Sequence, residues 1–352
     1  MSRDVLLQRL GVEVPILLAP MAGAGGPELA LAVARAGALP ALPCAMLDAA
    51  TLRRQVAEVR SDYGGPLNLN FFCHRPPPPD DAALRAWRAR LAPYYRALDL
   101  DPSAQAPAAE RRPFDAATCA LVEELRPGVV SFHFGLPDDA LLVRVRATGA
   151  VVLSSATTVA EARWLAARGV DAVIAQGLEA GGHRGSFLDD DPASQLGTFT
   201  LLPLVCDAVA VPVIAAGGIT DARGIDAAFA LGASAVQLGT AYLRAPQSII
   251  SSLHRAALAA ADTPTQLTNL FSGRPARGLR NRLMAELGPL AQVPPFPTAG
   301  HALGPLRQAA EQQGRTDFSP LWAGQAYPLA RDEDATAITR RLAAAIGQLA
   351  RD

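Results

Sequence analysis

The most informative feature of this 352-residue sequence is an absence, because it contains no lysine. All 32 basic residues are arginine. Enzymes that form a Schiff base, such as barrel aldolases and pyridoxal phosphate enzymes, need an internal lysine amine. The P-loop that binds nucleotide phosphates also contains a lysine. The sequence therefore excludes these classes of mechanism.

Cysteine, net charge and long apolar runs are also scarce. The four cysteines form no CxxC pair, so we expect ordinary core cysteines and neither a disulfide framework nor a metal site. They are Cys44, Cys73, Cys119 and Cys206. The net charge of −1 gives no general attraction to nucleic acid or to an anionic membrane. The apolar stretch near Ile16 is broken by Pro15 and Pro20, and the N-terminus has no signal-like region, so we expect no transmembrane span and a cytoplasmic location.

What the sequence does contain is a regular alternation of short, β-prone apolar runs with longer Ala-rich amphipathic segments. The runs cover residues 15–20, 38–44, 66–72, 128–134, 150–155, 171–177, 211–218 and 234–240. Strands that are almost continuously apolar and alternate with helices indicate a parallel sheet covered on both faces. Eight such units predict a (β/α)8 TIM barrel within an α/β fold. An open, doubly wound sheet is the structural alternative.

Two regions do not fit this repeat. Residues 73–113 carry a proline run and a helical stretch, and we expect a long excursion after the third strand. Residues 241–325 follow the eighth strand, and we assign them to a smaller, mainly helical lid domain that binds substrate. The barrel then comprises 1–240 and 326–352. The helical apolar spacing of 335–350 predicts that this last segment returns as the eighth barrel helix.

The loops after the seventh and eighth strands carry glycines that suit an anion. In TIM barrels the active site lies at the carboxyl ends of the strands, and a phosphate commonly binds at these two loops. Gly217 and Gly218 end one strand just before a helix, and Gly239 and Thr240 end the next. Exposed backbone N–H groups and a helix N-terminus would bind a phosphate there. The structural alternative is that these glycines only form tight turns.

The remaining strand ends favour a flat ring above that phosphate. The first strand ends in "APMAGAGG", which does not spell the dinucleotide motif GxGxxG. The open backbone at Ala22 and Gly23 could instead lie against a ring. Asn70 and Gln176 also fall at strand ends, and their amides both donate and accept hydrogen bonds. This combination suits the polar edge of a flavin. The structural alternative is that a single amide at a strand end only forms hydrogen bonds to a neighbouring loop.

Several motifs together resemble the nitronate monooxygenases, formerly called 2-nitropropane dioxygenases, which are FMN-dependent barrel enzymes. They are "APMAG", "NLNFF", "QGLEAGGHRG", "AAGGI", "QLGTAYL" and "SGRPARGLRNR". The resemblance covers nearly the whole chain. It implies FMN contacts from Ala22, Asn70, Gln176, Gly181, Gly218, Gln237, Leu238, Gly239 and Thr240.

The resemblance also implies a role for His183, which lies in the glycine-rich stretch "AQGLEAGGHRG". His183 matches the catalytic base of the family, and the substrates would be a small nitronate or nitroalkane and O2. An imidazole with a pKa of about 6.5 suits removal of a proton α to a nitro group. Glycines around it allow close approach to a substrate stacked on the flavin.

Other candidates surround this centre. His133 ends the fourth strand, and strand alternation predicts that it points inward beside the flavin with Ser131. It is then a candidate substrate contact, and the alternative is a structural histidine. Arg184 is expected to be a solvent or structural partner, and His74 a loop residue. We expect His254 on a helix surface.

One segment departs from the family pattern. In "FPTAGHALGPLR", nitropropionate-oxidising members carry tyrosines and a lysine that bind substrate, whereas this chain has Phe296 and His301 and no lysine. We therefore expect an altered substrate pocket that includes Phe296 and His301. This departure argues against the carboxylate-bearing propionate 3-nitronate as the substrate, and favours a more apolar nitronate or another substrate.

Two other functions fit the same motifs. One is an FMN-dependent reductase that uses NAD(P)H to reduce a quinone or an enoyl thioester. The other is a barrel that binds a phosphate ligand without redox activity. A nicotinamide site would identify the first, and the absence of a flavin spectrum would identify the second.

Overall fold

Eight parallel strands form the barrel that the alternating pattern predicts. The structure is a computed structural model that describes residues 3–78, 80–103, 111–189 and 191–347. The strands are β1 (Ile16–Leu18), β2 (Ala41–Pro43), β3 (Asn68–Phe72), β4 (Val129–His133), β5 (Val151–Ala156), β6 (Ala172–Gln176), β8 (Val213–Ala216) and β9 (Ala235–Leu238). Their order in the sheet is β1-β9-β8-β6-β5-β4-β3-β2. The Leu18 N–H donates to the Leu39 carbonyl at 2.9 Å, which brings β1 to the segment that leads into β2. The prediction of a TIM barrel is confirmed, and the open sheet is excluded.

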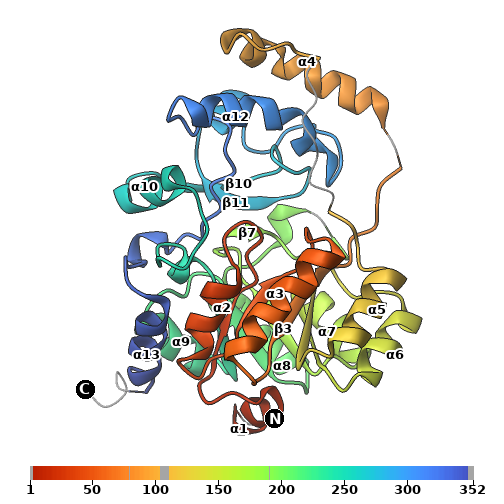
Figure 1. Cartoon of the computed structure of the whole chain (residues 1–352), viewed down its shortest axis with the longest axis vertical. Coiled ribbons are helices and arrows are strands. Elements are labelled where there is room, and N and C mark those ends of the chain that lie inside the picture. Colours follow the sequence, from red (N-terminus) through yellow and green to blue (C-terminus); the bar gives the residue numbers. More distant parts are fainter. Residues whose placement is uncertain (1–2, 79, 104–110, 190, 348–352) are drawn as a thin grey trace.

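Helices cover the outside of this barrel (Figure 1). They are α2 (Pro27–Ala34), α3 (Ala49–Asp62), α5 (Ala116–Leu125), α6 (Asp139–Ala147), α7 (Val159–Ala167), α8 (Thr198–Ala208), α9 (Ala222–Ala230) and α13 (Ala335–Ala344). Side-chain caps fix where several of them begin, as where the Asp115 carboxylate accepts from the Thr118 N–H at 2.8 Å. The final helix α13 packs beside α2, and the Thr336 hydroxyl donates to the Ala32 carbonyl at 2.8 Å. The last helix therefore returns to the barrel as its pattern predicts.

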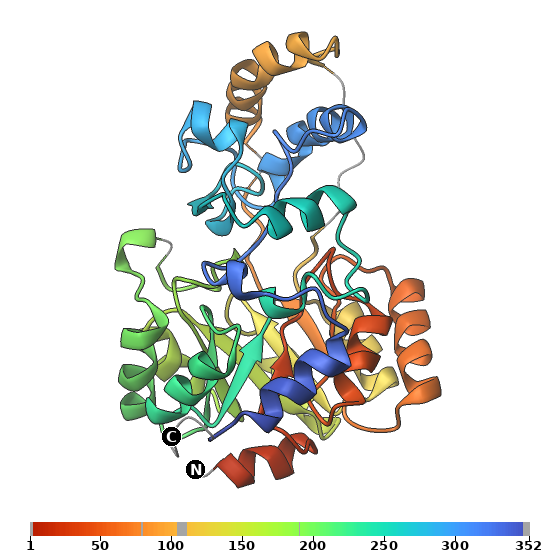
Figure 2. The same ribbon diagram turned by 90° about the vertical axis from the view of Figure 1, so that its left-hand side faces the viewer.

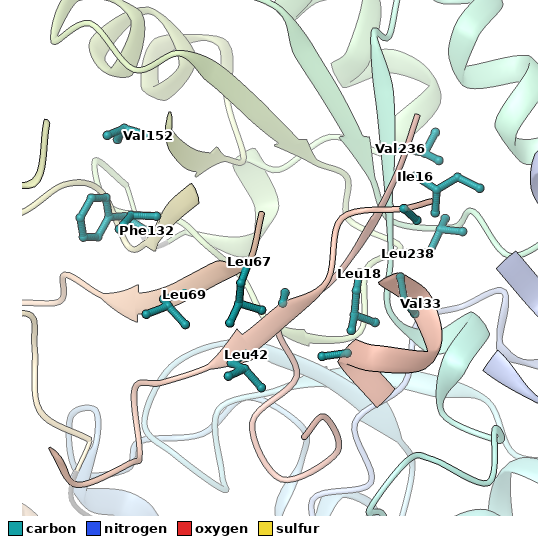
Figure 3. Close-up of a cluster of buried hydrophobic side chains, with 14 of the residues drawn as sticks. Ile16, Leu18, Val33, Leu42, Leu67, Leu69, Phe132, Val152, Val236 and Leu238 are labelled. Carbon is teal, nitrogen blue, oxygen red and sulfur yellow. The ribbon is translucent and has the colours of Figure 1, made fainter. Parts of the chain in front are cut away.

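Strand alternation separates two apolar layers. Side chains such as Ile16, Leu18, Leu69, Phe132 and Val236 point from the strands toward the helices, and Figure 3 shows part of this layer. The alternate positions fill the barrel interior. This inner cluster contains Leu17, Val129, Leu153, Ile174, Ile214 and Ala235, and it is joined by Leu6 and Leu10 of α1 (Arg3–Leu10). Polar side chains on the same inward face therefore occur toward the carboxyl ends of the strands, where the interior opens.

A second unit lies above the carboxyl end of the barrel, opposite the N-terminus (Figures 1 and 2). Its elements are α4 (Asp81–Ala97), α10 (Ser252–Ala260), β10 (Thr265–Thr268), β11 (Ala276–Leu279), α11 (Arg282–Leu287), η3 (Thr298–Leu303) and α12 (Gly304–Gln312). Helix α4 belongs to the excursion after β3, yet it is bound to this unit. The Trp87 indole N–H donates to the Ala299 carbonyl at 3.0 Å, and the Tyr95 hydroxyl donates to the Ala302 carbonyl at 2.7 Å.

The two units meet at a short strand from the barrel. Strand β7 (Gly182–His183) follows β6 and pairs antiparallel with β11, so that His183 lies opposite Ala276. Strands β10, β11 and β7 form a three-stranded sheet between the units (Figure 1). We propose that residues 241–325 act as the lid over the barrel of 1–240 and 326–352, with α4 as an added part of the lid core.

Candidate active site

A cavity of about 340 Å³ opens at the carboxyl ends of the strands, beneath the second unit. Ten of the residues singled out in the sequence line it: Ala22, Asn70, His133, Gln176, Gly181, His183, Gly218, Gln237, Gly239 and Thr240. The side chain of Leu238 instead packs in the helix-facing layer of the barrel. Phe296 and His301 are not among its lining residues. The barrel thus collects residues from seven separate loops and strand ends into one site.

Two glycine turns at one side of the cavity have a backbone conformation that could hold an anion. Gly217 and Gly218 have φ angles of 109° and 72°, a left-handed region that side chains rarely adopt. Helix α9 begins directly after them, with Asp221 as its cap. A Cβ atom on Gly217 would lie 3.0 Å from the Ala180 nitrogen, so the backbone there is also closely packed. Paired glycines before a helix N-terminus direct N–H groups at a bound phosphate.

The second turn follows β9, the strand that pairs with β8, so the two turns lie at neighbouring strand ends. A Cβ atom on Gly239 would lie 3.3 Å from both Ala19 and Met21, so a side chain there would press on the first strand loop. The Thr240 hydroxyl oxygen accepts from the Gly324 N–H at 2.9 Å, which leaves its proton available for donation. Gly239 and Thr240 could therefore add a close backbone approach and a hydroxyl donor to an anion site formed by the first turn.

Some side-chain amide atoms near the barrel mouth form hydrogen bonds within the protein, and others have no partner there. The Asn70 amide nitrogen donates to the Ser131 hydroxyl at 2.9 Å, which leaves its oxygen for another partner. Gln176 is tied to the β7 loop, since its nitrogen donates to the His183 carbonyl at 3.0 Å and its oxygen accepts from the Gly185 N–H at 2.8 Å. The Gln237 amide oxygen is buried and has no hydrogen-bond partner among the described residues. A buried acceptor without a partner is costly, so it indicates a ligand donor at that point.

His183 lies on β7 at the edge of the cavity. Its Nε2 is 2.8 Å from the Ser272 hydroxyl, which in turn lies 3.2 Å from the Arg274 carbonyl. A chain in which His183 donates to Ser272 and Ser272 donates to that carbonyl leaves the lone pair on Nδ1. Within the described residues, Nδ1 makes no hydrogen bond. This arrangement presents a proton acceptor that the protein itself does not use.

The surroundings of His183 are apolar and positively charged. Its ring centroid is 5.5 Å from that of Phe296 and 5.6 Å from that of Trp322. Burial and the nearby Arg111 guanidinium hold the pKa of His183 well below its usual value of 6.5. The imidazole is therefore neutral at pH 7, which keeps the lone pair on Nδ1 available.

His133 lies beside this group but uses both ring nitrogens within the protein. Nδ1 is 2.6 Å from the Ser155 hydroxyl, and Nε2 is 3.3 Å from the His183 carbonyl, to which it donates. Burial lowers the pKa of His133 to about 4. The geometry makes His133 a support for the β7 backbone as well as a part of the cavity wall.

The structure tests the predicted positions of three further residues. Arg184 is fully buried, and its guanidinium donates to the Gly177 and Gln176 carbonyls at 2.6 and 2.7 Å, so it is a structural partner of the loop and is not in solvent. The expectation that His254 lies on a helix surface is wrong, because it is 8% exposed and lines the cavity under α10. Other segments of the second unit pack against α10, as where Leu258 joins a cluster with Leu279 and Leu321, and the sequence pattern of α10 does not reveal these contacts. His74 does lie in a loop, where it is buried against Phe296 with ring centroids 4.8 Å apart.

Sequence reasoning missed three residues at this site. Ser272 lies within the quoted "SGRP" motif, and its hydroxyl was the only signal for a partner of His183. Trp322 lines the cavity from the far end of the lid segment. Arg111 also lines it, from the end of the excursion after β3, where nothing in the local pattern indicates a strand end.

The chain is thus a (β/α)8 barrel in which two glycine turns and a histidine with an unused ring nitrogen line one cavity. The family model for nitronate monooxygenase matches residues 3–343. The chain is 41% identical to a nitronate monooxygenase of Paraburkholderia phytofirmans over 97% of this chain and 94% of that protein. It is 40% identical to one of Pseudomonas aeruginosa over 96% of this chain and 98% of that protein. The protein therefore belongs to the nitronate monooxygenase family of oxidoreductases.

Two solved structures are similar to this chain over nearly its whole length. A nitroalkane oxidase from Streptomyces ansochromogenes superposes with a TM-score of 0.90 at 37% identity, covering 98% of this chain and 99% of that one. FabK from Thermotoga maritima superposes with a TM-score of 0.71 at 26% identity, covering 99% and 97%. In the part of the chain that the structure describes, no helix has the length and apolarity needed to span a membrane. Among the same described residues, no three or more His, Cys, Asp or Glu side chains cluster in a way that could hold a metal ion.

Proposed function

We propose that this protein binds FMN and oxidises small alkyl nitronates with O2, with His183 as the base that generates the nitronate from a nitroalkane. The names of its relatives support nitronate oxidation. The observation that carries the role of His183 is its neutral imidazole, whose Nδ1 is unused by the described protein and lies at the cavity. A base must be unprotonated and within reach of its substrate, and a neutral His183 at the cavity supports this role.

The donor and acceptor set fits FMN. The turns at Gly217–Gly218 and Gly239–Thr240 would hold its one phosphate, and the site has no second cradle of this kind among its described lining residues for a pyrophosphate. The Asn70 and Gln237 amide oxygens would accept from the ring N–H, while Ala22 and Gly181 leave space for its faces. Bound FMN supplies a two-electron acceptor that dioxygen can reoxidise. The fit favours FMN over FAD.

Each residue near the substrate has a separate task. Ser272 would orient the His183 ring through Nε2, so that Nδ1 points its lone pair at the α-carbon of a nitroalkane. Gln176 and His133 would fix the His183 backbone, since both donate to its carbonyl. Trp322 packs beside His183 and would exclude water from the site where the proton passes from the substrate to the imidazole. The low pKa of His183 makes it a weaker base but keeps it unprotonated over a wide pH range.

The test has two steps. Cofactor released by heat and separated by chromatography should be FMN, and recovery of FAD or of no flavin after reconstitution would contradict the proposal. The flavin-bound protein should then be mixed without oxygen, separately with ethyl nitronate and with NADH. Bleaching of the flavin by the nitronate supports the proposal. Rapid bleaching by NADH alone would favour the reductase of a quinone or enoyl thioester.

A further inference from the structure

We propose that Arg111 is the anion-binding residue of the substrate pocket and pairs with negatively charged oxygens of the substrate. The proposal rests on the function proposed above, because it assigns the substrate's charge a partner in the same cavity. It concerns a residue that lies outside the motifs shared with the family. The structural basis is a guanidinium that lines the cavity without a carboxylate of its own.

Arg111 is held in place by a rigid neighbour. Three residues further on, the Phe114 N–H donates to the Phe72 carbonyl at the end of β3, at 2.7 Å. The Phe114 ring also packs against Phe71 and Phe132, each with centroids 5.2 Å apart. The chain that carries Arg111 is thereby fixed to the end of a barrel strand.

The side chain of Arg111 extends from this anchor to the substrate side of the cavity. Its guanidinium carbon lies 5.9 Å from the centre of the Phe296 ring, and that ring is 5.5 Å from His183. Among the neighbouring charges, Arg111 has the largest effect in lowering the pKa of His183. The guanidinium therefore lies on the side of the proposed base, where a substrate would bind.

No carboxylate of the described chain neutralises this cation. Arg111 is partly buried, and it makes no ion pair or hydrogen bond through its guanidinium within the described residues. Two acidic residues at this end of the barrel already have other partners. Glu311 lines the cavity but pairs with Arg307 at 2.8 Å, and Glu179 accepts from the Thr198 N–H at 2.8 Å.

A buried cation without a partner is unfavourable, and a ligand anion removes that cost. Guanidinium presents a planar fork of N–H donors that matches two oxygens on one atom. A nitronate group and a carboxylate both have this geometry. Arg111 would restore a positive charge to a pocket in a chain that has no lysine. The shared chemistry is a planar pair of anionic oxygens, supplied either by the reacting nitronate group or by a second carboxylate.

The experiment compares Arg111→Gln with the wild type and with Arg112→Gln. Arg112 is the adjacent, exposed arginine, so the control makes the same change of charge in the same segment. Each protein is loaded with FMN and assayed for kcat/KM with ethyl nitronate and with propionate 3-nitronate. Calorimetric titration with propionate, which carries no nitro group, provides a binding constant that does not depend on turnover.

Loss of a hydrogen bond to a charged group predicts that Arg111→Gln lowers kcat/KM by about 10- to 150-fold. A similar loss with both nitronates identifies the nitronate group as the bound anion. A loss confined to propionate 3-nitronate, with weaker propionate binding, identifies the carboxylate. Arg111→Lys should give an intermediate loss, since it keeps the charge without the fork.

The proposal is overturned if Arg111→Gln and Arg112→Gln both stay within twofold of the wild type for the two nitronates and for propionate. It is also overturned if Arg111→Gln merely loses FMN, because the residue would then serve the cofactor. If the wild type oxidises neither nitronate while its propionate binding still requires Arg111, the proposed function fails and the anion site stands.

Discussion

Replacement of Gly185 by alanine tests how tightly the β7 loop is built around His133. The backbone of Gly185 lies outside the left-handed region, so alanine fits its conformation. The added Cβ would nevertheless lie 2.8 Å from Cε1 of His133 and 2.9 Å from the Ser155 hydroxyl. Both side chains must move away from the added Cβ, and this movement would disrupt the hydrogen bond of 2.6 Å between them.

The magnitude follows from two costs. Overpacking a well-packed interior costs about 1 to 3 kcal/mol. Loss of one or two hydrogen bonds of His133 adds about 1 kcal/mol. The sum is about 2 to 4 kcal/mol, which for a chain of this length lowers the thermal unfolding midpoint by roughly 3 to 5 °C. Since His133 supports the His183 carbonyl, kcat/KM should fall as well.

Thermal unfolding and steady-state kinetics of the same preparations provide the assay. Gly182→Ala is the matched control, because Gly182 has a φ of 72° and nothing within 4 Å of an added Cβ. That variant should show only the cost of a left-handed alanine, about 1 kcal/mol. The double variant Gly185→Ala with His133→Ala should be less destabilised than the sum of the single variants, because the contact of the added Cβ with His133 is gone and only the one with Ser155 remains. Strict additivity would refute this account of the loop.

Three other expected outcomes follow from the site. Ser272→Ala should lower kcat/KM for a nitroalkane about 2- to 12-fold with normal FMN content, and unchanged kinetics would argue against its role in orienting His183. Burial lowers the pKa of His254 to about 4, so its stabilising contribution is complete above pH 6.5 and is lost as the pH falls toward 4. In His254→Phe the thermal unfolding midpoint should therefore fall less steeply between pH 6.5 and pH 4 than in the wild type. An unchanged pH dependence of the midpoint would contradict this expectation. Substitution of Phe296 or His301 should change the preference among nitronates and leave the flavin spectrum nearly intact, and loss of FMN in both variants would assign this region to the cofactor instead.

Local pattern predicts the barrel well because each strand carries its own signal. Each of the eight apolar runs overlaps an observed strand, and the inward positions of Asn70 and Gln176 follow from simple alternation. The glycine turns at 217–218 and 239 are also visible in the sequence, since they lie at strand ends. These features depend on residues that are close together in the chain.

What could not be predicted depends on contacts between distant segments. Strand β7 has two residues, and it forms because β11, about ninety positions later, pairs with it. Helix α4 is amphipathic, but only the fold shows that its apolar face meets the lid. The burial of Arg184 and His254 likewise comes from partners that no periodicity identifies.

The most direct test of the central claim is the anaerobic rate of flavin reduction in His183→Asn, measured with a neutral nitroalkane and with its pre-formed nitronate. A positioned base contributes about 100- to 10,000-fold, so reduction by the nitroalkane should slow by that factor. The nitronate has already lost its α-proton and should be affected far less. FMN content should stay near normal, because the two glycine turns are unchanged. Equal losses with both substrates would contradict the role of His183 as the base.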